Sequence, residues 1–514
     1  MGDGCQTKHA TIVVVCGQIV RLSMGSQFAI ISEMIFDAVS YAQTFDPSNV
    51  KRKGLRALSD YLERSLGVSI VKNLRDIPFG RPDLAEPVKL AMLLKKNGII
   101  KSFEPVTYCP PDQPRMKNWY AICNDPTSHQ VGGSTWESDQ GAMYATLSEA
   151  LERYIWFTQD DYFIRPRRAT EAQMRAIGDY ISPKTFAGFS DGQRSHHPER
   201  ILRPEAQYTW IQGVSTLNGK HVYIPAQIVT GLNRNQISNG EKEPLIRQQN
   251  TNGLATWPTQ SGARVAGALE LIEREAYMIM WLNQLTLPRI PLQPLCAAHP
   301  ALARIIAKIE QYGFTVHAIQ LLTDAPTHAI AIIVEDMSGN APRFSIGLAA
   351  HWSLLHAFEK ALTEAFRSYR RHHHWVSKGN VWDVNTPAEA VGHLDRNFYW
   401  GVPEHAKHLE FMIEGREAAI ENAPWDTDTA DTHYQRIVQW CAEKGFEYIS
   451  VPLTKSAKNP TLLHVEMAVI PQLHPTYLNE SGQQFGGDRW YNVPKSLGMT
   501  PRQKPFAERP HPFS

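Results

Sequence analysis

The stretch Leu269-Glu270-Leu271-Ile272-Glu273-Arg274 lies in an apolar segment whose pattern predicts a long helix over residues 263–285. Its motif, Glu-x-x-Glu-Arg, also occurs earlier, in Ser148-Glu149-Ala150-Leu151-Glu152-Arg153, within a predicted helix over residues 140–156. Residues i and i+3 share one face of a helix, so each copy directs two carboxylates and an arginine to one place. A fold that joins the two copies could hold divalent cations with phosphate, because hard cations bind carboxylate and phosphoryl oxygens together.

A single copy of this motif is most simply explained as an exposed helical face with charge pairs at i, i+3 or i, i+4. The second copy argues against that explanation, because Glu270 and Glu273 stand among alanine, leucine and isoleucine residues. Burying a lone charge costs several kcal/mol or more, and metal ions would compensate for that cost. The chain has no Gly-x-x-x-x-Gly-Lys-Ser/Thr loop, so a nucleotide would need a different type of site.

Composition excludes several classes of protein. The 514 residues include 52 Lys and Arg against 51 Asp and Glu, and this balance does not indicate nucleic acid or an anionic membrane as a partner. No apolar run approaches the roughly 18 residues that span a bilayer. The six cysteines are scattered without a Cys-x-x-Cys pair, which argues against structural zinc and a disulfide framework. We therefore expect a reduced, cytoplasmic protein.

Residues 1–96 are expected to form a separate, mainly helical module. A short apolar strand at residues 12–16 precedes helical patterns at 30–42 and 54–66. A further helix comes after Pro82-Asp83 and ends at Asn97-Gly98, a typical helix-ending turn. Three short helices and a strand fit a winged-helix-like unit or a general helical cap, and the pattern leaves both open.

Residues 97–514 show a mixed pattern that predicts an α+β domain, with sheets on one side and helices on the other. Asn218-Gly219 between two alternating runs predicts a β-hairpin, and two further apolar runs, at 315–321 and 329–334, predict strands. Helices are expected at 171–177, with a capping box from Thr170 to Gln173, and at 351–371 and 434–444. Residues 501–514 hold four prolines and are expected to be a tail without regular structure.

Weaker motifs have simple explanations beside functional ones. Asn252-Gly253 permits a tight turn that presents amide groups to a ligand, or an ordinary loop. Gly132-Gly133-Ser134 is a weak phosphate motif. Lys360 and Glu364 are spaced as a surface ion pair on a helix. The run His372–His374 is either a metal site or, more simply, a set of cations that follow two arginines at a helix end and complement the helix dipole. His196-His197 is expected to be solvated.

Taken together, three of these stretches resemble the YcaO family, whose members bind ATP with three glutamate-bearing helices instead of a phosphate loop. The matching stretches are Ser148–Arg153, Asn252–Arg274 and Lys360-Ala361-Leu362-Thr363-Glu364-Ala365, and the resemblance extends over residues 97–514. It implies a YcaO-type ATP-binding domain with ATP and Mg2+ as cofactors. The implied magnesium ligands are Glu149, Glu270, Glu273 and Glu364, and the implied nucleotide contacts are Glu152, Arg153, Asn252, Arg274 and Lys360.

The C-terminal region resembles the azoline-forming members of that family. The similar stretches are Val469–Leu473, Arg489–Gly498 and Pro510-His511-Pro512-Phe513-Ser514. Those members end in a Pro-x-Pro-x-Pro tail whose terminal carboxylate reaches the active site. By this analogy Ser514 supplies a proton-accepting carboxylate, while Pro510 and Pro512 stiffen the tail. The sequence departs from the family at Lys360 (usually Arg), Gln472 (usually Gly) and Ser514 (usually Pro).

The resemblance implies an ATP-dependent cyclodehydratase that converts Cys, Ser or Thr of a ribosomally made precursor peptide to thiazoline or oxazoline, as in bacteriocin maturation. It also implies a ubiquitin-activating-enzyme-like partner that binds the leader peptide, and a flavin-dependent dehydrogenase as a further partner. Residues 1–96 would dock the partner or the peptide. The alternatives are a YcaO enzyme that forms a thioamide or amidine, and a non-catalytic peptide-binding scaffold. Clustered carboxylates argue against a scaffold, and the proline-rich tail favours azolines.

Overall fold

The computed structural model describes residues 12–15, 18–21 and most of 85–513. The internal gaps in the second range are 107–108, 110–112, 137, 159–165, 232–242, 340, 378–383, 385, 391, 421–427 and 454–462. The chain divides into two units, one of residues 1–78 with 104–115 and one of residues 79–103 with 116–514.

In the smaller unit, β1 (Ile12–Val15) pairs antiparallel with β2 (Gln18–Arg21). The strand predicted at residues 12–16 is therefore confirmed. The helices predicted at 30–42 and 54–66 lie outside the described residues, and so does most of the proposed winged-helix-like unit.

The larger unit contains three antiparallel arrangements of strands, joined by helices. The sheets are ordered β3-β4-β5, β10-β11-β12 and β6-β7-β13-β14-β9, the last with β8 paired to β7. This mixture confirms the predicted α+β class. The strands are β3 (Ile100–Pro105), β4 (Lys117–Cys123), β5 (Gln130–Thr135), β6 (Arg167–Ala169), β7 (Tyr208–Ser215), β8 (His221–Pro225), β9 (Leu254–Trp257), β10 (Phe314–Gln320), β11 (His328–Asp336), β12 (Phe344–His351), β13 (Ile449–Pro452) and β14 (His464–Val469).

Most helices begin and end near their predicted positions. The capping box of Thr170 and Gln173 is present, and Gly219 has the positive φ that the hairpin turn requires. The helices are α3 (Ala85–Lys96), α4 (Asp139–Thr158), α5 (Glu171–Ile177), α6 (Asp191–Ser195), α8 (Gln260–Asn283), α9 (Leu292–Ala298), α10 (Pro300–Gln311), α11 (Leu354–Ser377), α12 (His393–Gly401), α13 (Pro403–Ala406), α14 (Ala430–Lys444) and α15 (Arg489–Ser496).

The strand β11 explains why its sequence is apolar without alternation. Ala329, Ala331 and Ile333 belong to the core cluster that contains α8, whereas the intervening Ile330, Ile332 and Val334 belong to the cluster that contains α11. Successive side chains of a strand point to opposite faces, so a strand covered on both sides needs apolar residues throughout. The sheet β10-β11-β12 therefore lies between α8 and α11.

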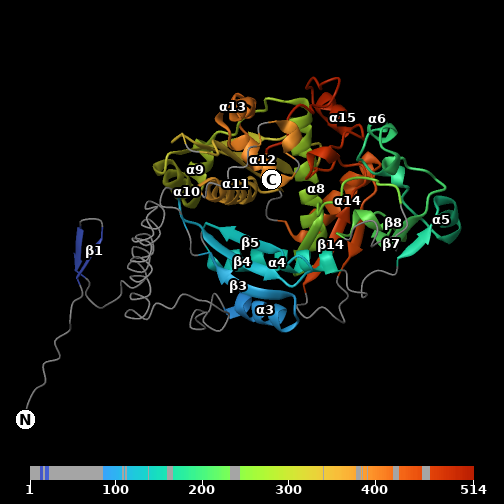
Figure 1. The fold of residues 1–514 in the computed structure, drawn as a ribbon, viewed down its shortest axis with the longest axis horizontal. Coiled ribbons are helices and arrows are strands. Elements are labelled where there is room, and N and C mark those ends of the chain that lie inside the picture. Colours follow the sequence, from blue (N-terminus) through green and yellow to red (C-terminus); the bar gives the residue numbers. More distant parts are fainter. Residues whose placement is uncertain are drawn as a thin grey trace, which may run out of the picture. The chain divides into compact units, whose positions relative to one another are not determined.

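Helix α8 lies in the middle of the larger unit, with α11 and α12 on one side and α14 and β14 on the other (Figure 1). The predicted arrangement, with sheets on one side and helices on the other, is therefore wrong in this detail. The α8 sequence is apolar around most of its circumference because it packs against β9, β12 and β14 at once. No helix among the described residues is long and apolar enough to cross a membrane.

The start of α11 was placed wrongly by the sequence pattern. Residues 351–353 were expected to be helical, but His351 ends β12 and the helix begins at Leu354. β12 was not expected at all. Its residues from Phe344 to Ala350 are buried, since the strand packs between α8 and α11.

The buried residue His474 gives the fold a measurable acid sensitivity. It is 1% exposed, its ring Nδ1 donates to Pro475 O at 3.0 Å, and burial lowers its pKa to about 4. In the unfolded chain a histidine takes up a proton near pH 6.5, so stability from neutral His474 is present above that pH and is lost as the pH falls toward 4.

We expect the difference in unfolding free energy between the wild type and His474→Asn to fall by about 2 kcal/mol from pH 7 to pH 5. Urea unfolding of both proteins at several pH values measures it, and groups common to both cancel. A difference that stays constant over this range would contradict the assignment.

Candidate functional site

Helices α4, α8 and α11 bring the predicted site residues to adjoining faces of the larger unit. α4 packs on β5 and β9, α8 packs on β9 and β12, and α11 packs on β12. Shared strands therefore fix the three helices relative to one another. We call the acidic residues Glu149, Glu152, Glu270, Glu273 and Glu364 the carboxylate cluster.

The guanidinium of Arg274 lies among three of these carboxylates. One of its terminal nitrogens is 3.2 Å from Glu273, 3.6 Å from Glu270 and 3.9 Å from Glu364. Glu270 and Glu273 precede it on α8, whereas Glu364 comes from α11. The structure thus brings the second Glu-x-x-Glu-Arg copy together with the Lys360–Ala365 stretch.

Lys360 also joins α11 to α8. Its Nζ donates to Glu273 Oε2 at 3.1 Å, and Glu273 is only 1% exposed. The simple interpretation of Lys360 and Glu364 as a surface pair is therefore wrong. A lysine on one helix instead compensates a buried carboxylate on the next.

The first Glu-x-x-Glu-Arg copy faces the second. On α4, Arg153 lies 3.6 Å from Glu149. The pKa of Glu152 is raised to about 8, mainly by burial; Arg153 lowers it, whereas the negative charges of Glu149 and Glu270 contribute to the rise. An effect of Glu270 on Glu152 requires the acidic faces of α4 and α8 to lie near each other.

The pKa values within the cluster differ because the cations are unevenly shared. Burial raises the pKa of Glu270, although Arg274 counteracts it. Burial also disfavours ionisation of Glu273, but Lys360 and Arg274 outweigh that effect and lower its pKa. Glu273 is accordingly held in its charged form, as a cation ligand should be.

Backbone amides hold two of the carboxylates in place. Gly253 N donates to Glu270 Oε2 at 2.9 Å, and Leu348 N donates to Glu364 Oε2 at 2.8 Å. The predicted turn at Asn252-Gly253 exists, with φ +91° at Gly253, where a Cβ would lie 2.3 Å from Ala468 O. The amide of Gly253 thus positions a carboxylate.

Two other predicted contacts are hydrogen-bonded within the protein. Asn252 is buried, and its Nδ2 donates to Thr476 Oγ1 at 2.8 Å. Gly132-Gly133-Ser134 lies within β5, and Gly133 N donates to Thr146 Oγ1 of α4 at 2.8 Å. A Cβ at Gly133 would lie 2.4 Å from Ala142 O, so this glycine permits close packing of β5 on α4 and does not offer its amide to phosphate.

The cluster fits a magnesium nucleotide. Glu273 Oε1 and Arg274 Nε are both buried, and neither forms a hydrogen bond. Carboxylates can supply oxygens to magnesium, and a guanidinium with a free N–H can bind phosphate. Among the described residues no three His, Cys, Asp or Glu side chains already stand at metal-binding spacing. Mg2+ does not need such a cage, since one or two carboxylates together with phosphate oxygens and water are sufficient.

The C-terminal segment, residues 506–513, reaches the same guanidinium. The Phe513 ring packs on Arg274 with its centroid 4.2 Å from the guanidinium carbon. Pro510 is buried and Pro512 is half-buried, so the expected tail without regular structure is nevertheless packed into the protein. Ser514 lies outside the described residues.

The sequence did not single out the residues that hold this segment. Trp400 Nε1 donates to Pro510 O at 3.1 Å, Tyr277 OH accepts from Phe513 N at 3.2 Å, and Arg396 contacts both His511 and Phe513. The available signal was Arg396 itself, a charge next to the aromatic residues at 398–400.

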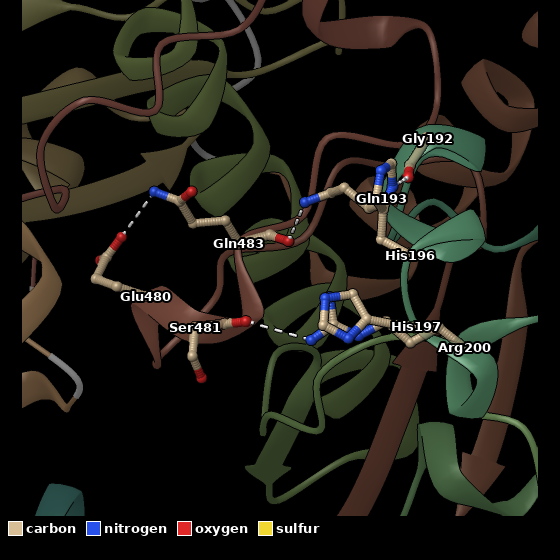
Figure 2. A pocket seen from close by; sticks show the side chains of 8 residues that line it. All are labelled: Gly192, Gln193, His196, His197, Arg200, Glu480, Ser481 and Gln483. Carbon is tan, nitrogen blue, oxygen red and sulfur yellow. Dashed lines mark hydrogen bonds between the residues drawn. The ribbon is translucent and has the colours of Figure 1, made fainter.

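A second feature is a cavity of about 320 Å3 between α6 and the turn at residues 480–482 (Figure 2). Gln193 Nε2 donates to Gln483 O at 2.8 Å across it, and Arg200 donates to Ser481 O at 3.3 Å. His196 and His197 line this cavity and are both exposed, so the prediction that they are solvated is confirmed.

Comparison with known proteins identifies the family. A family model described as "YcaO cyclodehydratase, ATP-ad Mg2+-binding" matches residues 136–474, which include α4, α8 and α11. The match confirms the predicted family and its cofactors, ATP and Mg2+. A curated relative, an uncharacterized protein of Methanothermobacter thermautotrophicus, is 22% identical over 228 residues, 42% of this chain and 58% of the relative.

Solved structures share the fold. "Heterocyclase in complex with substrate and Cofactor" matches with a TM-score of 0.64 and 20% identity, over 82% of this chain and 57% of that one. YcaO from Methanopyrus kandleri bound with AMPPCP and Mg2+ matches at 0.55 and 16%, over 76% and 91%. A chain of the E. coli microcin synthetase McbBCD complex with pro-MccB17 bound matches at 0.54 and 13%, over 80% and 96%. The chain spans about three fifths of the curated relative and of the first heterocyclase.

Proposed function

Because the chain belongs to the YcaO cyclodehydratase family, we propose that it is an ATP-dependent peptide cyclodehydratase acting in the cytoplasm. Its substrate would be a ribosomally made precursor peptide whose Cys, Ser or Thr residues become thiazoline or oxazoline. The observation that carries the proposal is the position of Arg274, which touches carboxylates from α8 and α11 on one side and Phe513 of the C-terminal segment on the other.

In the proposed reaction the thiol or hydroxyl group of the substrate gives up its proton, and its sulfur or oxygen bonds to the preceding carbonyl carbon. Bound ATP with magnesium supplies the phosphoryl group that makes the carbonyl oxygen a leaving group. The amide nitrogen loses its proton as the C=N bond of the ring forms, so one water is lost overall and leaves as part of phosphate. The work left to the protein is positioning and charge neutralisation.

The contacts within the carboxylate cluster support the proposed roles. Glu149, Glu270, Glu273 and Glu364 would hold magnesium, and the amides of Gly253 and Leu348 keep two of them oriented. Glu152, Arg153, Asn252, Arg274 and Lys360 would contact the nucleotide. Ser514 would accept the proton through its carboxylate, with Pro510 and Pro512 stiffening its approach.

The partners remain those expected from the sequence. We propose a separate ubiquitin-activating-enzyme-like protein that binds the leader peptide, docked by residues 1–96, and a flavin-dependent dehydrogenase that acts afterwards. The match to 96% of one chain in a multi-subunit synthetase supports a partner on a separate chain.

Mass spectrometry tests the reaction. Candidate precursor peptides are incubated with the protein, its partner and Mg2+-ATP, and we expect the loss of one water for each ring, only when ATP is present. Replacement of oxygen by sulfur after addition of sulfide would indicate thioamide formation instead. Peptide binding without ATP consumption or any mass change would indicate a scaffold and contradict the proposal.

A further inference from the structure

Arg396 is a fully buried cation in the middle of α12. Its exposed fraction is 0%, and it stands beside the buried Phe398, Tyr399 and Trp400. A guanidinium in such surroundings must satisfy its donors within the protein, because an unpaired buried charge costs several kcal/mol. The groups that Arg396 contacts therefore indicate which parts of the structure its charge stabilises.

Most of these contacts are made with the C-terminal segment and the loop beside it. One terminal nitrogen of Arg396 donates to Phe513 O at 2.9 Å and to His511 Nδ1 at 3.1 Å, and the other donates to Tyr477 O at 3.3 Å. The second ring nitrogen of His511, Nε2, donates to Tyr477 O at 2.8 Å. His511 can accept this bond only while it is neutral. Burial lowers the pKa of His511, with Arg396 lowering it further, so the ring stays neutral.

The counter-charge comes from the wall of the cavity in Figure 2. Arg396 Nε lies 3.3 Å from Glu480 Oε1, and Glu480 is one of the residues that line this cavity. Arg396 thus joins three parts of the chain, namely α12, the turn at residues 480–482 and the C-terminal segment. A planar guanidinium can hold several acceptors at fixed angles, which a lysine cannot do.

The far end of the held segment lies at the carboxylate cluster. Arg396 donates to the Phe513 carbonyl, while the Phe513 amide donates to Tyr277 OH and the Phe513 ring packs on Arg274. Phe513 is therefore fixed on three sides, and one of those sides is a member of the second Glu-x-x-Glu-Arg motif.

We infer that Arg396 is a positioning residue that holds the C-terminal segment against the carboxylate cluster. The inference rests on the proposed function only where it concerns catalysis, because the docking itself is a property of the fold. Arg396 makes no contact with the carboxylate cluster among the described residues, so it acts through Phe513 and His511.

Hydrogen exchange of the full-length protein tests the docking without any substrate. In Arg396→Gln we expect the amides of residues 506–513 to exchange at least about tenfold faster than in the wild type, because the local opening becomes easier. Arg194→Gln is the matched control, since Arg194 also donates to three backbone carbonyls but to none in this segment. Arg396→Lys keeps the charge, carries the test if the glutamine variant does not fold, and should be intermediate.

Activity gives a second, separate readout. We expect kcat for ring formation to fall about a hundredfold in Arg396→Gln while KM for ATP changes less than about twofold, with partial recovery in Arg396→Lys. Unchanged exchange in residues 506–513 would overturn the inference. So would faster exchange combined with an unchanged kcat. A third outcome is faster exchange in Arg396→Gln together with no ring formation by the wild type. That outcome would contradict the proposed function but support the docking role of Arg396.

Discussion

Glu273→Gln is expected to lower the kcat of ATP-dependent water loss by about 10²–10³-fold, the range seen when one preorganised electrostatic group is removed from an active site. Glu273 is 1% exposed and lies 3.1 Å from Lys360 and 3.2 Å from Arg274, so its negative charge is central to the carboxylate cluster. Glutamine keeps the shape and removes the charge that a magnesium ion would bind. Alanine should act in the same direction. Ring formation followed by mass spectrometry measures the loss.

The same helix provides the control. Glu275, two residues further along α8, is also buried, but it pairs with Arg489 away from the cluster. Glu275→Gln should lower stability yet retain the activity of each folded molecule. If both variants lost activity equally, or if Glu273→Gln kept wild-type activity, the assignment of Glu273 would be wrong.

Arg489→Met is expected to lower the free energy of unfolding by about 3–5 kcal/mol, the usual effect of removing one partner from a buried ion pair. Arg489 begins α15, and its guanidinium donates to both oxygens of Glu275 at 2.7 Å and to Asp324 Oδ1 at 2.7 Å. Lys444 lies 2.9 Å from Asp324 and partly compensates it, whereas Glu275 would be left buried without a cation. Urea unfolding measures the change.

A second substitution distinguishes an unpaired charge from lost packing. Adding Glu275→Met to Arg489→Met removes the stranded carboxylate, and we expect the double variant to recover at least about half of the lost stability. A double variant that is less stable than Arg489→Met would show that packing, and not the charge, dominates at this position.

Much of the site could be predicted from the sequence because its determinants are local. The i, i+3 spacing in Glu-x-x-Glu-Arg defines a helical face without any knowledge of the fold, and Asn218-Gly219 and Thr170 specify their turn and cap within a few residues. Each of the other motifs is weak evidence alone, and the family resemblance rests on their occurring together and in the same order.

The other features of the site depend on which helices and strands pack together, and the spacing of residues in the sequence does not specify this. Lys360 could pair with Glu364 one turn away, but tertiary packing placed Glu273 of α8 within reach instead. β12 was not predicted because its sequence, Phe344–His351, mixes apolar residues with serine, glycine and histidine, and so shows neither alternation nor a continuous apolar run. In the sequence Arg396 is a single charge near aromatic residues. Its contact with His511, 115 residues later, is shown only by the structure.

Arg274 also affects how the site would behave in turnover. Arg274 already offsets part of the negative charge of Glu270, Glu273 and Glu364, so repulsion among these carboxylates is reduced before any ligand binds. Binding of a magnesium nucleotide would then exchange ion pairs within the protein for ion pairs with magnesium and phosphate. The affinity for the nucleotide would then be the small difference between the energy of the ion pairs formed and that of the ion pairs lost. A moderate affinity of this kind would favour product release as much as substrate binding.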